Sequence, residues 1–176
     1  ANDNAIRVVI ETNKGDIHLE LWPDKAPKTV DNFLAYIDAK HYDGSIFHRI
    51  ARGGIGVIQG GGFSPRLRRL PTGGPIANEA RADVSNRRGT IAMARLPHPH
   101  SATDQFYINQ RDNTALDFRA PNNDDFGYCV FGTVTDGLDI VDAIYAVQTA
   151  DVSVPGGVMG GVPLDPIIIM SIRRDN

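Results

Sequence analysis

Two glycine-rich runs and a pair of histidines could bind a phosphate or a metal ion, judged by residue type and spacing. Gly53–Gly56 and Gly60–Gly62 are followed by neither a Lys-Ser/Thr pair nor a helical pattern, so neither run fits a phosphate-binding loop. Turns and bulges at strand ends explain these glycines better. His98 and His100, on either side of Pro99, lack a third ligand at suitable spacing. We therefore expect a surface loop there, with no metal and no cofactor.

The charge balance argues against a general affinity for polyanions. The chain has 18 Lys and Arg against 21 Asp and Glu, for a net charge of -3, and its one basic cluster, Arg66–Arg69, falls in an expected loop. That cluster is predicted to be a solvated arm, and no nucleic acid partner is expected. No apolar stretch approaches the ~20 residues that span a bilayer, so no membrane partner is expected either. Cys129 lies in an apolar run and is predicted to be a buried thiol.

The length of 176 residues suits a single domain, 1–176, with its core at about 6–173. The first residues, Ala1 to Asn4, fit a processed secretory product, a cytosolic protein without its initiator methionine, or an expression product. We expect a periplasmic location, with the cytoplasm as the alternative, and a monomer.

The hydrophobic pattern predicts short strands, long loops and two helices. Ile6–Thr12 and Ile17–Trp22 flank a turn and predict a hairpin with one buried face. Apolar residues at helical spacing predict helices around 30–37 and 138–145. The other expected strands are Ile46–Ile50, Ile55–Gln59, Thr90–Ala94, Gln105–Asn109, Tyr128–Val134 and Ile167–Ile172. This order favours a mainly β fold, a closed antiparallel barrel with the helices capping its ends.

Three segments carry the most specific pattern of the chain. The first runs from Ile46-Phe47-His48-Arg49-Ile50 to Phe63, the second from Asn78 to Arg95, and the third from Ser101 to Gly132. In order and spacing they resemble bacterial cyclophilins, from about Val8 to about Ile172. The resemblance implies an eight-stranded barrel with two capping helices and catalysis of rotation about X-Pro peptide bonds. It also implies proline-containing peptides and unfolded proteins as partners, and a role in protein folding.

Rotation about a peptide bond breaks no bond, so it requires no nucleophile, metal or redox cofactor. The barrier of roughly 18–20 kcal/mol is the loss of amide resonance in the twisted state. A catalyst should hold the proline ring in an apolar pocket and place a donor near the imide nitrogen, whose lone pair is available only when the bond twists. By the resemblance, Arg49 is this donor, and Gln59 holds both the arginine and the substrate backbone.

The same resemblance assigns the substrate-binding residues. Tyr107 falls where the family usually has a phenylalanine on the floor of the proline pocket. Leu116 matches a leucine of the pocket wall, and Tyr128 matches a position held by histidine or tyrosine. Gln105 matches a glutamine beside the neighbouring subsite. Ala94-Arg95 replaces an Ala-Asn segment whose backbone aligns the peptide, so the Arg95 side chain is a departure.

A larger departure affects the pocket wall. Nine residues, 50–58, separate the catalytic arginine from the glutamine, where the family commonly has seven that include a Phe-Met pair. Placing the two extra residues early puts Gly56 and Val57 at the Phe-Met positions, and placing them late puts Gly54 and Ile55 there. We prefer Val57 because it shares strand parity with the glutamine. Either alignment removes an aromatic wall, which predicts attenuated activity.

Two further expectations follow from the departures. Ala115 stands where eukaryotic members often have a tryptophan that binds cyclosporin, so weak or no cyclosporin binding is expected. The altered wall also leaves a rival function, a weakly catalytic module that binds proline peptides. A holdase-type chaperone is a third possibility, compatible with either. The retained Arg49 and Gln59 favour the enzyme.

Overall fold

Ten strands, two α-helices and one short 3-10 helix make up the computed structural model of this protein, which describes residues 3–176. The strands are β1 (Ile6–Thr12), β2 (Gly15–Leu21), β3 (Arg49–Ala51), β4 (Val57–Gly60), β5 (Thr90–Met93), β6 (Phe106–Asn109), β7 (Val130–Asp136), β8 (Thr149–Val154), β9 (Gly157–Pro163) and β10 (Ile169–Arg174). The helices are α1 (Pro27–Asp38) and α2 (Leu138–Tyr145), and the 3-10 helix is η1 (Thr114–Leu116). None of the helices within residues 3–176 is long and apolar enough to cross a membrane.

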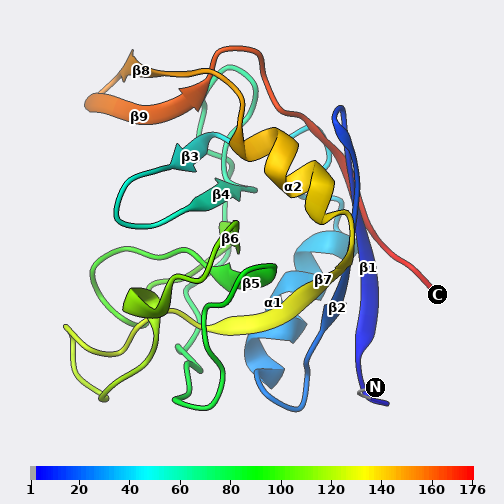
Figure 1. The fold of residues 1–176 in the computed structure, drawn as a ribbon, viewed down its shortest axis with the longest axis vertical. Helices are drawn as coiled ribbons and strands as arrows, with labels where there is room; N and C mark the ends of the chain where they lie inside the picture. Colours follow the sequence, from blue (N-terminus) through cyan, green and yellow to red (C-terminus); the bar gives the residue numbers. More distant parts are fainter. Residues whose placement is uncertain (1–2) are drawn as a thin grey trace.

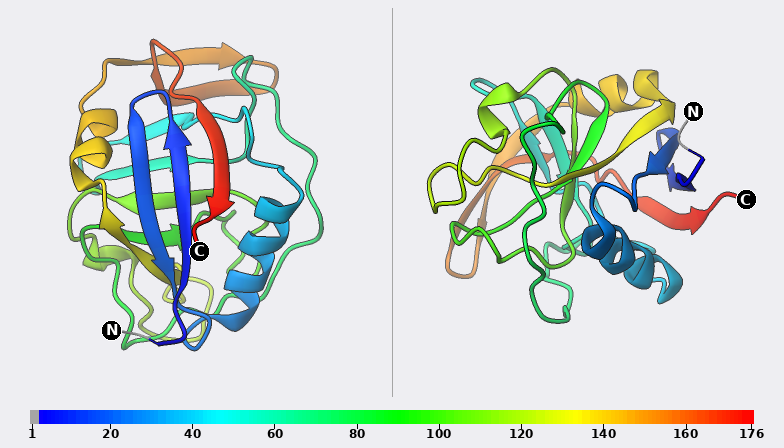
Figure 2. Two further views of the ribbon diagram at one scale, coloured as in Figure 1. Left: turned by 90° about the vertical axis from the view of Figure 1, so that its right-hand side faces the viewer. Right: turned by 90° about the horizontal axis from the view of Figure 1, so that it is seen from below.

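Eight strands form one antiparallel sheet in the order β10-β1-β2-β7-β5-β6-β4-β3 (Figure 1). In the left-hand view of Figure 2, β1, β2 and β10 lie in front and run across β3–β6 behind them, so the sheet curls over on itself. No ladder joins the edge strands β3 and β10 in the described part of the chain. A single bridge, Ile46 to Ile168, links the segments that precede them. The expected barrel is therefore a curled sheet, and closure by a complete ladder is not seen.

The predicted N-terminal hairpin is present, and its alternating pattern has the expected cause. Ile17, Leu19 and Leu21 on β2 are buried, while the residues between them are not fully buried. The turn between β1 and β2 ends at Gly15, whose φ of 131° is open to glycine but strained for other residues. The Thr12 hydroxyl donates to the Gly15 carbonyl at 2.7 Å and ties the turn together.

The two predicted helices lie on opposite sides of the β1–β2 hairpin, as the left-hand view of Figure 2 shows. Helix α1 has Pro27 in its first turn, where the missing N–H costs no hydrogen bond, and it packs near β10. Its N-terminus is held by Glu79, whose Oε1 accepts from both the N–H and the hydroxyl of Thr29, at 2.7 and 2.8 Å. Helix α2 follows Gly137 and packs against β2 and β4.

The main core is built around aromatic rings inside the curled sheet. The Phe33 ring of α1 lies 5.2 to 5.5 Å, between centroids, from the rings of Tyr42, Phe106 and Phe131. A second, smaller apolar cluster contains Val57, Ala92, Tyr107 and Val130, which are all buried. This second cluster lies under the surface on which the candidate site is found.

Two parts of the fold differ from the sequence-based expectation. Residues 46–48 do not belong to β3, because the backbone bonds of Ile46 and Phe47 go to Gly61, Phe63 and Ile167, which lie just outside the strands of the sheet. The β8–β9 hairpin was not predicted at all. Most residues of its strands are exposed or only partly buried and few are large and apolar, so the clearest local signal is the Pro155-Gly156 turn between them.

Candidate functional site

Arg49 and Gln59 are brought together by the β3–β4 hairpin. The two residues are direct partners in the ladder, and Arg49 Nη1 donates to Gln59 Oε1 at 3.0 Å. Gln59 Nε2 in turn donates to Gln105 Oε1 at 2.9 Å, which fixes the orientation of the Gln59 amide. The nine-residue spacing does not disturb this alignment, because the longer segment forms the loop 52–56 at the end of the hairpin.

These side chains border a cavity of about 370 Å³ at the open face of the second apolar cluster. Its lining consists of Arg49, Ile55, Val57, Gln59, Ala94, Arg95, Tyr107, Leu116 and Tyr128. Eight of the ten predicted site residues are in this lining, and Ile55, which belonged to the late alignment, joins them. Gln105 lies next to it, in the lining of a neighbouring cavity that also contains Gln59 and Arg95.

Gly56 is the predicted residue that does not face the cavity. A Cβ at this position would lie 3.0 Å from Arg111 Nε and 3.1 Å from the Tyr145 hydroxyl, on the side away from the lining. Its N–H donates to Asn113 Oδ1 at 3.0 Å, and its carbonyl accepts from Asn113 Nδ2 at 2.9 Å. The placement of Gly56 in the pocket wall is corrected, because residues 55 and 57 point one way along the chain and residue 56 the other.

A buried polar network lies beneath the cavity floor. The Tyr107 hydroxyl donates to Asn86 Oδ1 at 2.7 Å, and Asn86 is fully buried. Asn86 Nδ2 donates to the Leu116 carbonyl at 3.2 Å, so one asparagine joins the floor of the cavity to its wall. Burial raises the pKa of Tyr107 well above its usual value, which keeps the hydroxyl a donor. Sequence reasoning missed Asn86, because an asparagine in a loop is usually solvated.

Arg95 is held flat against one side of the cavity. Its guanidinium lies over the Tyr128 ring, 4.4 Å from the ring centroid. Nε and Nη2 donate to the Gly127 carbonyl at 3.2 and 2.9 Å, and Nη1 donates to the Leu96 and Pro97 carbonyls. The arginine that replaces the expected asparagine is therefore an ordered part of the rim.

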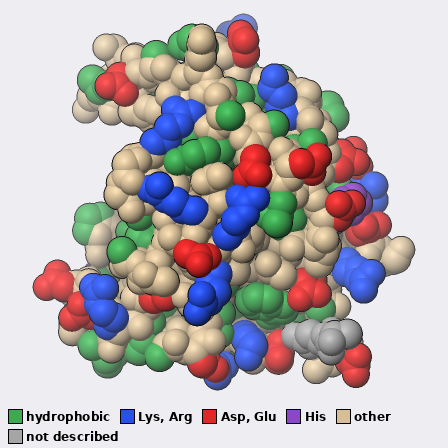
Figure 3. Space-filling view, in the orientation of Figure 1, with side chains coloured by type: hydrophobic (Ala, Val, Ile, Leu, Met, Phe, Trp, Pro, Cys, Tyr) green, Lys and Arg blue, Asp and Glu red, His purple; other side chains and the backbone are tan. Residues whose placement is uncertain are grey.

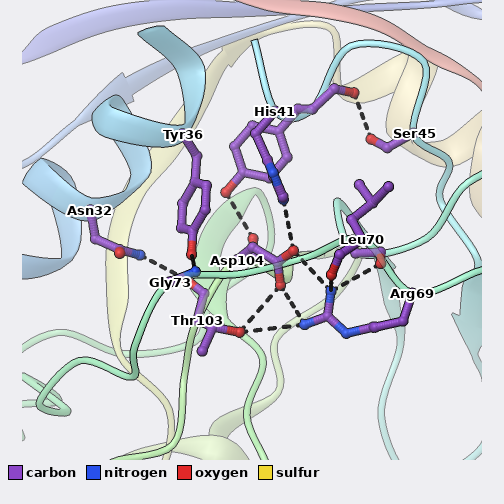
Figure 4. A network of polar contacts seen from close by, with 11 residues as sticks. Asn32, Tyr36, His41, Ser45, Arg69, Leu70, Gly73, Thr103 and Asp104 are labelled. Carbon is purple, nitrogen blue, oxygen red and sulfur yellow. Dashed lines mark hydrogen bonds and ion pairs between the residues drawn. The ribbon is translucent and has the colours of Figure 1, made fainter. Parts of the chain in front are cut away.

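Figure 4 shows a second network, which anchors the loop 62–74 beside the neighbouring cavity. Arg69 donates to both carboxylate oxygens of Asp104, at 2.7 and 2.9 Å, and His41 Nε2 lies 2.8 Å from Oδ2. Burial alone would raise the pKa of Asp104, but the hydrogen bonds from Arg69 and His41 outweigh it and lower that pKa. The predicted solvated arm is thus wrong for Arg69, whose partner lies 35 positions away in the sequence.

His48 directly precedes Arg49 in the sequence and is buried. Its Nδ1 has no hydrogen-bond partner, and its ring lies 4.5 Å from the Phe63 ring, between centroids. Burial, followed by the positive charges of Arg49 and Arg69, lowers the pKa of His48 to about 4. The imidazole is therefore neutral at pH 7.

In residues 3–176 there is no group of three or more His, Cys, Asp or Glu that could hold a metal ion.

We expect His48 to make the protein less stable as the pH falls from about 6.5 to about 4. The unfolded chain binds a proton at His48 near pH 6.5, whereas the folded protein binds it only near 4, so protonation favours unfolding in that window. The loss at pH 5 relative to pH 7 is about 2 kcal/mol. His48→Phe should remove this difference in paired urea titrations at the two pH values. An unchanged difference in the variant would show that the loss comes from other groups.

Residues 7–174 match the family model described as cyclophilin type peptidyl-prolyl cis-trans isomerase. The chain is 46% identical over 165 residues to peptidyl-prolyl cis-trans isomerase B of Escherichia coli K12, a match that covers 94% of this chain and 97% of that protein. It is also 46% identical over 168 residues to peptidyl-prolyl cis-trans isomerase cyp18 of Streptomyces antibioticus, covering 94% and 96% of the two chains.

Solved structures agree with the sequence matches. A cyclophilin type peptidyl-prolyl cis-trans isomerase from Cryptosporidium parvum has a TM-score of 0.77 and 26% identity, covering 98% of each chain. A second structure of that protein, determined in the presence of the dipeptide Ala-Pro, has a TM-score of 0.75 and 27% identity, covering 97% of this chain and 99% of that one.

Proposed function

The chain belongs to the cyclophilin-type peptidyl-prolyl cis-trans isomerase family and is such an isomerase, and we propose that rotation occurs in the cavity beside Arg49. One observation carries this assignment. The hydrogen-bonded pair Arg49–Gln59 borders a cavity whose lining also contains the apolar or aromatic side chains of Val57, Tyr107 and Leu116. A charged donor beside an apolar seat is the arrangement that a twisted X-Pro bond requires.

The roles follow from the contacts of each side chain. The proline ring sits on Val57 and Tyr107, which are buried, with Leu116 as a wall. Arg49 donates to the imide nitrogen as the bond twists and its lone pair becomes available. Because this contact is absent in the planar ground state, it stabilises the transition state selectively. Gln59 accepts one N–H of Arg49 and so limits where the remaining guanidinium donors can point.

We further propose that extended proline-containing segments of unfolded proteins lie along the edge formed by Ala94, Arg95 and Gln105. The Ala94 N–H donates to the Gln105 carbonyl at 3.1 Å, so this edge is held in place before a peptide arrives. The Ala-Pro dipeptide named with the Cryptosporidium parvum structure is a ligand of the matching chemistry. Backbone groups of this segment that are not already bonded can align an extended peptide by hydrogen bonds.

Because this wall of the cavity is aliphatic, we expect a lower isomerisation rate than in family members that have a Phe-Met pair there. Ile55 and Val57 occupy this side of the cavity, and both are smaller than phenylalanine. Burying an aromatic ring contributes about 1.5–3 kcal/mol, so the loss of half of that in the transition state slows the reaction several-fold or more. The rival, a module that binds proline peptides with little catalysis, is favoured by the same wall.

The proposed function is tested by a protease-coupled assay on X-Pro peptides at low temperature. We expect the isomerisation rate to rise in proportion to protein concentration, above an uncatalysed background of ~10–100 s per exchange at 25 °C. Binding of the same peptides without any increase in rate would instead establish the binding module. Neither binding nor acceleration would refute both functions.

Cyclosporin is expected to bind weakly. Ala115 lies on η1 next to the wall residue Leu116, is exposed, and offers neither the area nor the N–H of an indole ring. Ala115→Trp should raise the affinity by roughly tenfold or more, since a tryptophan at the centre of an interface is worth ~2 kcal/mol or more. Titration calorimetry on both proteins checks this. Tight binding by the parent would mean that another side chain supplies the missing contact.

A further inference from the structure

Two arginines line the cavity, Arg49 and Arg95, and neither forms an ion pair within the described residues. Arg52 and Arg111, which lie outside the lining, also donate only to carbonyl or hydroxyl oxygens among these residues. Elsewhere, arginines in ion pairs with Asp or Glu are Arg69, Arg81, Arg87, Arg88, Arg119, Arg173 and Arg174. Figure 3 shows Lys and Arg side chains, with some Asp and Glu among them, on the face that carries β3, β4 and α2. The linings of this cavity and of the neighbouring one contain arginines and no acidic side chain, in a chain whose net charge is -3.

Arg95 is the member of this group that is best placed to select a substrate. It lines both the proline cavity and the neighbouring cavity of the same size, about 370 Å³. The two cavities also share Gln59 and Ala94. When the proline of a peptide lies in the first cavity, a residue next to that proline therefore lies beyond Arg95, in the second cavity.

The hydrogen bonds of Arg95 leave it able to bind one more acceptor. A guanidinium has five N–H groups. Nε, both N–H groups of Nη1 and one of Nη2 are used in the four bonds to Gly127, Leu96 and Pro97. One N–H of Nη2 remains, on a group that the Tyr128 ring and these carbonyls hold in one orientation. Because it is already ordered, the side chain loses little entropy when it binds an acceptor.

We propose that Arg95 is a specificity-determining residue that favours substrates with an acidic side chain within two positions of the proline. This inference rests on the proposed function, because it concerns the peptide turned over in the same cavity. A carboxylate satisfies the free N–H of Arg95 and gains from the unpaired charges of the rim. A neutral amide of the same shape gains only the hydrogen bond, and a lysine is repelled.

The test compares matched peptides that differ only in charge. Glu, Gln and Lys are placed in turn at each of the two positions before and after the proline, and kcat/KM is measured by NMR exchange. At one or more positions we expect Glu to exceed Gln by about two- to fivefold, the range for a partly exposed ion pair, and Lys to fall below Gln. The Glu advantage should shrink as the salt concentration rises from about 0.02 to 0.5 M, because salt screens exposed charges.

Three variants separate Arg95 from the general charge of the protein. Arg95→Gln should bring the Glu-to-Gln ratio close to one, and Arg95→Lys should keep part of the preference. Arg7→Gln removes the same charge from an exposed position on β1, outside the cavity, and should leave the ratio unchanged. If the Gln peptides are accelerated but the parent ratio is one at every position, the specificity proposal is wrong and the isomerase assignment stands. No acceleration of any peptide would refute the isomerase assignment itself.

Discussion

Arg49→Ala should lower kcat/KM for X-Pro peptides by about 10²–10³-fold, the loss seen when one transition-state donor is removed from an enzyme. The melting temperature should barely change. Arg49 is exposed, and its one side-chain hydrogen bond goes to Gln59, so its removal leaves no buried group unpaired. Protease-coupled kinetics and thermal unfolding on the same sample check both statements.

Two further variants test whether the loss of rate is specific to the guanidinium group at position 49. Arg49→Lys keeps the charge but loses the planar fork that engages Gln59, so we expect an intermediate rate. Arg7→Ala removes an exposed arginine of β1 and should retain the parent rate and stability. A normal rate for Arg49→Ala would mean that the imide nitrogen is served by another donor, and the catalytic assignment of Arg49 would have to be abandoned.

The second large effect is expected at Gly56. Gly56→Phe should destabilise the protein by about 1–3 kcal/mol without raising the rate, because the ring would have to displace Arg111 and Tyr145 and would not enter the cavity. Arg111 and Tyr145 occupy the space that its Cβ would enter, and the Asn113 side chain is hydrogen-bonded to both its N–H and its carbonyl. Urea titration and kinetics on the purified variant test the two parts separately.

Ile55→Phe is the matched control, since Ile55 lines the cavity and is only partly buried. There we expect the fold to tolerate the ring and kcat/KM to rise several-fold, as an aromatic wall is restored. A stable, faster Gly56→Phe variant would instead show that residue 56 reaches the proline. A stable Ile55→Phe variant with no gain would show that the missing aromatic does not limit the rate.

Helices and strands could be predicted from the sequence where buried residues recur at a regular spacing along one segment. Strand β2, with every second residue buried, and helix α1, with its stripe at helical spacing, were predicted for this reason. The β8–β9 hairpin was missed because most of its residues are exposed or only partly buried, so its hydrophobic pattern is weak. The closure expected of the barrel rests on contacts between the two edge strands, which no local pattern encodes.

The features of the candidate site likewise divide into those that could be predicted from the sequence and those that could not. Arg49 and Gln59 were predicted as a pair from the resemblance, whose motif lies within one short segment, and in the structure they are direct partners in the β3–β4 ladder. The direction of Gly56 depends on Asn113, 57 positions away, and the shape of the floor depends on the bond between Tyr107 and Asn86, 21 positions away. Such long-range polar contacts carry no spacing signal. The pairing of Arg69 with Asp104 was missed for that reason also.

The central claim is that X-Pro bonds rotate in the cavity lined by Arg49, and one NMR experiment tests it most directly. An X-Pro peptide is added to ¹⁵N-labelled protein, and the cis/trans exchange of the peptide and the amide shifts of the protein are followed in the same tube. We predict exchange cross-peaks at catalytic protein concentrations, together with shifts at Gln59, Ala94, Tyr107 and Leu116, four residues of the cavity lining. Exchange at the uncatalysed rate, or catalysed exchange with shifts confined to residues outside this cavity, would contradict the account.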